Sequence, residues 1–177
     1  MISSYLKEEI DLRISRISAL LAEMGCDAML VTSNVNLFYT SGRVFSGYTY
    51  ITKEGEVKYF VKRPVGLQGD NVKYIRKPEQ IVELLEAKPQ KIALELDSLT
   101  VNDYTRLSKV FADSEKCDAS GILRRCRAVK TAYEIEKMKE CGVGHDEAYK
   151  HIREIYREGM TDMELQVEVE RQLRLQG

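Results

Sequence analysis

The sequence lacks a hydrophobic run long enough to cross a membrane. A membrane helix needs about 20 consecutive apolar residues, and no stretch of the 177 residues approaches that length. The first nine residues carry more acidic than basic side chains, and they lack the basic stretch that opens a signal peptide. We therefore expect a cytoplasmic protein that makes no contact with a membrane.

An excess of positive charge is also missing. Lys and Arg total 27 against 28 Asp and Glu, for a net charge of −1. Proteins that bind the nucleic-acid backbone usually carry a basic excess, so we expect no nucleic-acid partner. The one basic cluster, Arg124–Arg127 with Lys130, has no interleaved aromatic residues. We interpret it as a solvated connector whose charges pair with acids of the next segment, such as Glu134 and Glu136.

Cysteine is sparse, and no two cysteines form a C-x-x-C pair. A cytosolic chain keeps isolated thiols reduced, where they most often act as small buried hydrophobic residues. A structural disulfide is the lesser alternative. The four cysteines are Cys26, Cys117, Cys126 and Cys141.

Recognisable catalytic and cofactor motifs are absent. The two histidines, His145 and His151, are six residues apart on a predicted helix, whereas a helical ligand pair needs a spacing of three or four. The sequence contains no glycine-rich phosphate loop and no G-x-S-x-G elbow. Glu95 and Asp97 end a predicted strand, but without companion groups we interpret them as solvated acids or helix caps. We expect neither a metal site nor a catalytic residue in this chain.

Helix and strand patterns alternate through residues 1–120. An apolar stripe of helical spacing ends at Gly25, and two β-rich runs flank a turn in which Gly55 takes positive φ. This alternation predicts an α/β fold with a mixed β-sheet flanked by helices. The predicted helices are 6–24, 35–39, 78–85 and 100–111, the last with Val101, Tyr104, Leu107 and Phe111 facing inward. The predicted strands are 28–31, 48–51, 57–61, 72–75, 92–96 and 117–119.

The pattern of predicted secondary structure changes after residue 121. Residues 131–177 contain no pattern typical of a strand. Thr131 and Glu134 form a capping box that starts a helix running to Glu158, and Thr161–Glu164 start another. Glycines 142 and 144 weaken the middle of the long helix, so we expect close packing there. Two helices alone cannot build a core, and their apolar faces need another structure to cover them.

A loop and a short helix follow the first predicted strand, where open α/β sheets favour ligand contacts. This segment and its continuation to residue 48 combine aromatic residues, glycines and one arginine. We take five of its residues as candidates for contacts to a substrate or a partner, the alternative being that the aromatics only seal the domain edge. The candidates are Asn36, Tyr39, Arg43, Phe45 and Tyr48.

Three segments resemble the creatinase/prolidase family. Asn36-x-x-Tyr39-x-Ser41-Gly42 is similar to the N-x-x-Y-x-[ST]-G segment of its N-terminal domain. The run from Arg127 through Lys130 and Thr131 to Glu134-Ile135 is similar to the R-x-[IV]-K-[ST]-x-x-E-[IL] junction that opens its pita-bread catalytic domain. Residues 159–165 are similar to the helix start G-x-[ST]-[ED]-x-E-[LI] of that domain. The chain departs from the family at Glu140-Cys141-Gly142, where small alanines are common.

The resemblance implies two parts. Residues 1–126 would be the creatinase N-terminal domain, with a ribonuclease H-like α/β fold. Residues 127–177 would be the first helices of a truncated pita-bread domain, with Arg127, Lys130 and Glu134 at the junction.

The resemblance further implies that the parent protein hydrolyses the peptide bond before proline, as a prolidase or an aminopeptidase P does. The parent would use two divalent ions (Mn, Co or Zn) and proline-containing peptides, and would form a homodimer. Its N-terminal domain would mediate dimerisation and close over the active site of the partner subunit. The family's metal ligands, two Asp, one His and two Glu, lie beyond the matched segments, so none falls in this chain and the chain alone should be inactive.

Two other functions fit the same architecture. One is a non-catalytic protein-interaction module, as in the large subunit of a histone chaperone. The other is a metal-free amidinohydrolase of the creatinase type. The downstream sequence of the parent would separate these alternatives, because only the peptidase requires the five ligands.

Overall fold

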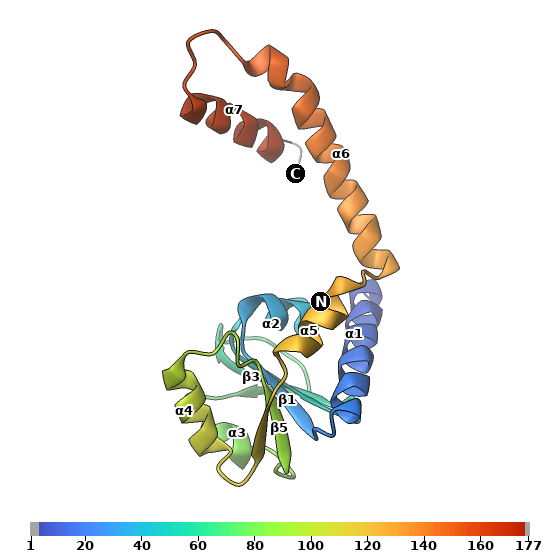
Figure 1. Cartoon of the computed structure of the whole chain (residues 1–177), viewed down its shortest axis with the longest axis vertical. Helices are drawn as coiled ribbons and strands as arrows, with labels where there is room; N and C mark the ends of the chain where they lie inside the picture. Colours follow the sequence, from blue (N-terminus) through green and yellow to red (C-terminus); the bar gives the residue numbers. More distant parts are fainter. Residues whose placement is uncertain (1–3, 176–177) are drawn as a thin grey trace. The chain divides into compact units, whose positions relative to one another are not determined.

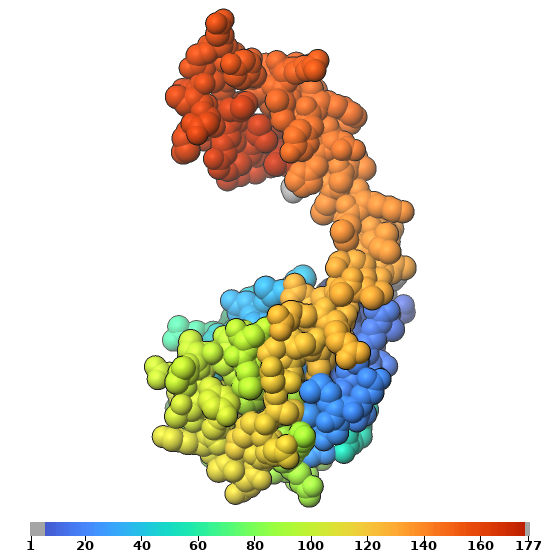
Figure 2. All heavy atoms as spheres, viewed as in Figure 1, coloured from blue at the N-terminus to red at the C-terminus, as the bar shows by residue number. Residues whose placement is uncertain are grey.

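The structure is a computed structural model that describes residues 4–175, and their side chains from Leu6 onward. The chain divides into two compact units, residues 1–129 and 130–177 (Figures 1 and 2). The first is an α/β unit and the second consists of two helices. In residues 4–175 no helix is both long and apolar enough to cross a membrane.

A six-stranded mixed sheet forms the centre of the α/β unit, in the order β4-β3-β2-β1-β5-β6. The β1–β2 and β2–β3 pairs are antiparallel, and the other three pairs are parallel. The predicted α/β fold with a mixed sheet is therefore confirmed. The strands are β1 (Ala28–Val31), β2 (Ser46–Thr52), β3 (Val57–Arg63), β4 (Val72–Tyr74), β5 (Lys91–Leu94) and β6 (Glu115–Asp118).

Helices cover both faces of this sheet (Figure 1), and each face of the sheet has its own apolar core beneath its helices. On one face, α1 (Ser4–Glu23) and α5 (Ser120–Ala128) pack on Met29, Ile51 and Ala93. On the other face, α3 (Gln80–Glu83) and α4 (Val101–Val110) pack on Leu30, Phe60 and Leu94. Strand residues alternate between the two faces, so β1 can be buried on both sides. A further short helix, α2 (Asn34–Ser41), follows β1 directly.

Most local signals act as the sequence predicts. Gly25 lies beyond α1 at φ 65°, and Gly55 takes φ 93° in the β2–β3 turn. Both conformations favour glycine because a Cβ would strain them. Thr100 caps α4 by accepting a hydrogen bond from the backbone N–H of Asp103.

Two helices of the α/β unit depart from the expectations. On α4 only Leu107 is buried, together with Phe111 directly after the helix, whereas Val101 is 80% exposed and Tyr104 39% exposed. The first turn of α4 therefore extends past the core, and the predicted inner face was too long. The arginines of the basic cluster are not in a connector, because they lie on α5, which buries Ile122, Leu123 and Cys126 and leaves these arginines exposed. This amphipathic helix was missed because its apolar residues are few.

The cysteines also differ from the expectation of four separate thiols. The structure brings the sulfurs of Cys26, which precedes β1, and Cys117 on β6 into contact, with their Cα atoms 7.7 Å apart, which is farther than a disulfide spans. Both side chains belong to the core beneath α1 and α5. Cys126 is a buried free thiol, whose burial raises its pKa, and Cys141 is an exposed one.

The second unit contains α6 (Ala132–Ile155) and α7 (Asp162–Leu175). Both begin with the predicted capping boxes, at Thr131–Glu134 and Thr161–Glu164. Close packing at Gly142 is not observed, since a Cβ there would meet nothing within 4 Å. Ala148 is the one buried residue of α6, and α7 has none.

Candidate functional site

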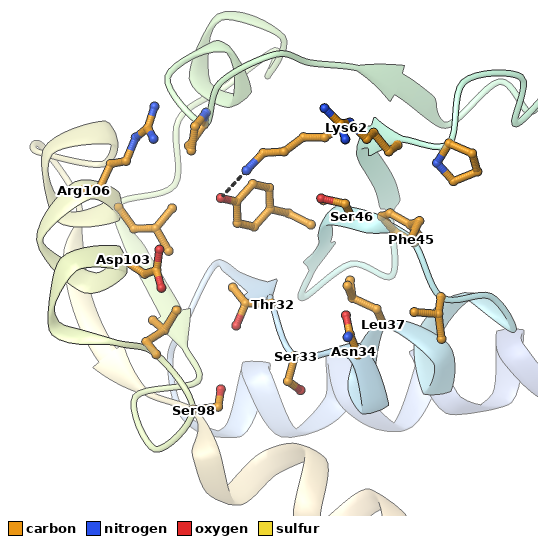
Figure 3. Close-up of a pocket in the computed structure, with 18 of the residues that line it drawn as sticks. Thr32, Ser33, Asn34, Leu37, Phe45, Ser46, Lys62, Ser98, Asp103 and Arg106 are labelled. Atoms are coloured by element: carbon orange, nitrogen blue, oxygen red, sulfur yellow. Dashed lines mark hydrogen bonds between the residues drawn. The ribbon is translucent and has the colours of Figure 1, made fainter.

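A groove of about 990 Å³ lies at the edge of the sheet where β1, β3 and β5 end and β2 begins (Figure 3). Open α/β sheets bind ligands outside the carboxyl ends of their strands, which is where this groove opens. Thr32 and Ser33 follow β1, Ser98 follows β5, and Lys62 lies next to the last residue of β3. The first turns of α4 contribute Asp103 and Arg106. The groove therefore draws on elements that are distant in sequence.

The carboxylate of Glu95 organises the inner side of this edge. Glu95 is 2% exposed and follows β5. Its oxygens accept five hydrogen bonds, from the backbone N–H and hydroxyl of both Thr32 and Ser33 and from the Asn36 amide. A buried carboxylate is stable only when it is satisfied in this way. The interpretation of Glu95 as a solvated acid is wrong. Asp97, by contrast, is exposed and pairs with Arg124 at 3.3 Å.

Asn36 connects this carboxylate to the end of α5. Its Nδ2 donates to Glu95, and its Oδ1 accepts from Nη1 of Arg127 at 3.3 Å. The structure thus brings together two candidate residues that are 91 positions apart in the sequence. Ser33 does not cap α2 with its side chain, because its hydroxyl is bonded to Glu95.

Tyr39 points into the interior and not into the groove. Its ring lies 4.5 Å from the Arg13 guanidinium, and its hydroxyl donates to the carbonyl of Cys126 at 3.3 Å. Arg13 also donates to Glu9 at 2.7 Å within the buried interior. These contacts tie α1, α2 and α5 together, so Tyr39 stabilises the position of α2.

Phe45 is buried too, with its ring edge-on to Tyr59 at a centroid distance of 6.2 Å. Burial raises the pKa of Tyr59 to about 12. Arg43 stands exposed just beyond α2, after Gly42 ends the helix at φ 70°. Of the five candidates, Arg43 is therefore the one placed for contact with another molecule through a freely exposed side chain.

Tyr48 lines the groove and is the partner of the dashed hydrogen bond from Lys62 in Figure 3. The ammonium group of Lys62 donates to the Tyr48 hydroxyl at 3.2 Å and lies 4.8 Å from the centre of its ring. The nearby guanidinium of Arg106 is engaged by both carboxylate oxygens of Glu79, at 2.9 and 3.0 Å. Hydrogen bonding to Arg106 lowers the pKa of Glu79 to about 2.

The remaining junction candidates start the second unit. Glu134 accepts a hydrogen bond from the backbone N–H of Thr131 at 2.9 Å, and Thr131 accepts one from the N–H of Glu134 at 3.1 Å. This capping satisfies two backbone donors at the start of α6. Lys130 stands directly before the cap.

Residues 4–175 contain no group of three or more His, Cys, Asp or Glu side chains placed to hold a metal ion. On α6, His151 contacts Glu154 at 2.9 Å. The described residues therefore do not fit a two-metal centre, and no catalytic step is assigned to them.

Sequence reasoning missed two side chains of this edge, Glu95 as its organiser and Lys62 in its groove. The pattern carried a signal for Glu95 only, namely an acid directly after a buried strand. Lys62 has no local signal, because its neighbour Tyr48 comes from another strand.

Comparisons with known proteins identify relatives of this chain. Residues 13–129 match the family model described as the creatinase/prolidase N-terminal domain. The Bacillus subtilis (strain 168) protein described as "Uncharacterized peptidase YqhT" is 26% identical over 180 residues, covering 94% of this chain and 50% of that protein. An Xaa-Pro dipeptidase of Lactobacillus delbrueckii subsp. lactis is 26% identical over 186 residues, covering 93% and 50%.

A solved structure shows the same fold. The Xaa-Pro dipeptidase from Bacillus anthracis superposes with a TM-score of 0.82 at 25% identity, over 95% of this chain and 50% of that one. The chain spans about half the length of the curated relatives it matches. With its α/β unit matched almost throughout, the chain belongs to the creatinase/prolidase N-terminal domain family.

Proposed function

We propose that this chain is the N-terminal part of an Xaa-Pro peptidase of the prolidase or aminopeptidase P type. The observation that carries the proposal is the extent of the match to the dipeptidases, which continues past the α/β unit into α6 and α7. A likeness confined to residues 13–129 would support the family alone. The parent protein would hydrolyse the peptide bond before proline.

In this proposal, residues 127–177 begin the catalytic domain, and the metal ligands lie in a part of the parent that follows them. Two divalent ions (Mn, Co or Zn) would activate water and stabilise the oxyanion there. The apolar residues that α6 and α7 expose support this division, because such faces are normally buried against further structure. Examples are Met138, Val143, Met163 and Val167, each at least 59% exposed.

The α/β unit would mediate homodimerisation and cover the active site of the partner subunit. Arg43 supports this role because it is exposed, as is Phe38 on the preceding helix, and arginine and aromatic residues are enriched at interface centres. Asn36, Tyr39 and Phe45 would hold the segment in shape from within, while Tyr48 would face the ligand from the groove.

Parallel assays of the full-length parent and of this chain test the proposal. With Mn²⁺ and Xaa-Pro dipeptides, the parent should show metal-dependent hydrolysis that a chelator abolishes, and the chain alone should show none. A parent sequence without two Asp, one His and two Glu, together with an inactive parent, would contradict the proposal. Metal-dependent turnover by a contaminant-free preparation of the chain would contradict the proposal that the metal ligands lie in a later part of the parent.

A further inference from the structure

The ammonium group of Lys62 is a half-buried charge in the groove. Its contacts are the ring and hydroxyl of Tyr48, and no ion pair joins it to a carboxylate within residues 4–175. Lys58, on the same face of β3, instead pairs with Glu86 at 3.1 Å. A tyrosine holds a cation in place but does not neutralise it. Lys62 is therefore oriented and still lacks a counter-charge.

The charges around Lys62 favour a ligand with a single negative charge. Arg106 is held bidentately by Glu79, so it contributes little free positive charge. Arg63 adds one exposed cation to the groove, while Asp103 adds an anion whose oxygen accepts from Thr100. The three cations and two carboxylates leave an excess of about one positive charge, and Asp103 would repel a dianion twice as strongly as a monoanion.

The walls of the groove add an apolar surface to this charge. Val44 and Val65, which are 59% and 84% exposed, line it together with Pro64 and the half-buried Leu99. The hydroxyls of Thr32, Ser33 and Ser98 already donate to Glu95 or to its backbone carbonyl. Ligand sites commonly combine apolar walls with a few placed polar groups. A bare inorganic ion would leave these walls unused.

We propose that the groove binds a small monocarboxylate with an apolar body, the chemistry of the carboxyl end of a short peptide, and that Lys62 donates to its carboxylate. The site consists of residues of the α/β unit only, so the proposal does not depend on the parent being a peptidase. The Lys62 ammonium has three N–H donors, of which one reaches Tyr48.

Titration of the ¹⁵N-labelled chain by NMR tests this site with N-acetyl-L-leucine as the probe. The amide signals of residues 32–33, 46–48 and 98–99 should shift, with a dissociation constant on the order of 1–10 mM. N-acetyl-L-leucinamide, which lacks the charge, and inorganic phosphate should each bind at least about fivefold more weakly. Added salt should weaken the binding of the acid and not that of the amide.

Variants assign the effect to Lys62. K62M should weaken binding of the acid about tenfold, K62R should retain most of it, and the matched control K58M should leave it unchanged. Dispersed amide spectra would verify that each variant is folded, and the comparison of ligands on the wild-type chain needs no variant. Equal affinity for acid and amide, equal or tighter binding of phosphate, equal losses in K62M and K58M, or no shift at 50 mM N-acetyl-L-leucine would each overturn the proposal.

Discussion

At the scale of single residues, Asn36 shows how one side chain serves several elements. Its amide donates to the buried carboxylate after β5 and accepts from Arg127 at the end of α5. Both of its polar atoms are therefore used within the α/β unit. These two hydrogen bonds give Asn36 a structural role, because they connect the segment after β5 to the end of α5.

Replacing Glu95 with Gln should destabilise the chain. Glutamine keeps one acceptor oxygen and turns an NH₂ group toward donors of Thr32, Ser33 or Asn36, which leaves buried donors unpaired. We expect the free energy of unfolding to fall by about 2–3 kcal/mol, measured by chemical denaturation. D97N removes an exposed charge at the same strand end and should change stability by less than about 0.5 kcal/mol. If E95Q were as stable as D97N, the hydrogen bonds to the Glu95 carboxylate would contribute little to the free energy of unfolding.

Asp27 should make stability depend on acid pH. Its carboxylate accepts from Lys53 and from the backbone N–H groups of Gln90 and Lys91, and the hydrogen bond from Lys53 and the backbone bond from Lys91 lower its pKa below 3.8. Because the pKa is lower in the folded than in the unfolded chain, the ionised carboxylate stabilises the fold at pH values above the unfolded-state pKa. This contribution is lost as the pH falls through the folded-state pKa.

We therefore expect D27N to lower the free energy of unfolding at pH 7 by about 1–2 kcal/mol. The difference between wild type and D27N should shrink as the pH falls below about 4, the ordinary carboxyl value. Urea denaturation at several pH values measures this difference. If the difference in free energy of unfolding between wild type and D27N stayed constant from pH 7 down to pH 2, the Asp27 charge would not have the role assigned to it.

At the scale of elements, the two units differ in how much of each helix is buried. Helix α1 buries Ile10, Ile14, Ile17 and Leu21 in one stripe, whereas α7 buries no residue. The capping boxes of α6 and α7 satisfy their first N–H groups but add only about 1 kcal/mol each. Packing and not capping supplies most helix stability in proteins.

Hydrogen exchange should therefore distinguish the helices. In the 177-residue chain, amides of β1 and β5 should be the most protected, and protection should fall after about residue 140 in α6 and remain low through α7. Mass spectrometry of peptide fragments measures this profile. Uniform protection through residue 175 would show instead that these helices are stabilised by a surface of this chain or of a second copy.

At the scale of the whole molecule, we predict that the exposed Arg43 of the α/β unit contacts a second chain or a substrate. In the full-length parent, R43A should raise KM several-fold or weaken dimerisation, because an arginine that binds a carboxylate bidentately would be lost. Tm should stay within about 1–2 °C of wild type, since Arg43 is exposed.

The exposed Arg76 provides a control for the loss of one positive charge. R76A should alter neither KM nor the dimer dissociation constant. Should R43A lower Tm while both kinetics and dimerisation stay intact, the segment 36–48 would be purely structural.

The sequence by itself determined the local structure and the family. The stripe of α1, the turn at Gly55 and the capping box at Thr131 depend on residues within one or two turns, so their patterns predict the elements directly. Only the tertiary structure decided what the polar side chains do. Glu95 became a buried acceptor because β1 and β5 are neighbours, and Lys62 meets Tyr48 because β2 and β3 pair. These contacts join residues 14 to 63 positions apart, a separation that no local pattern records.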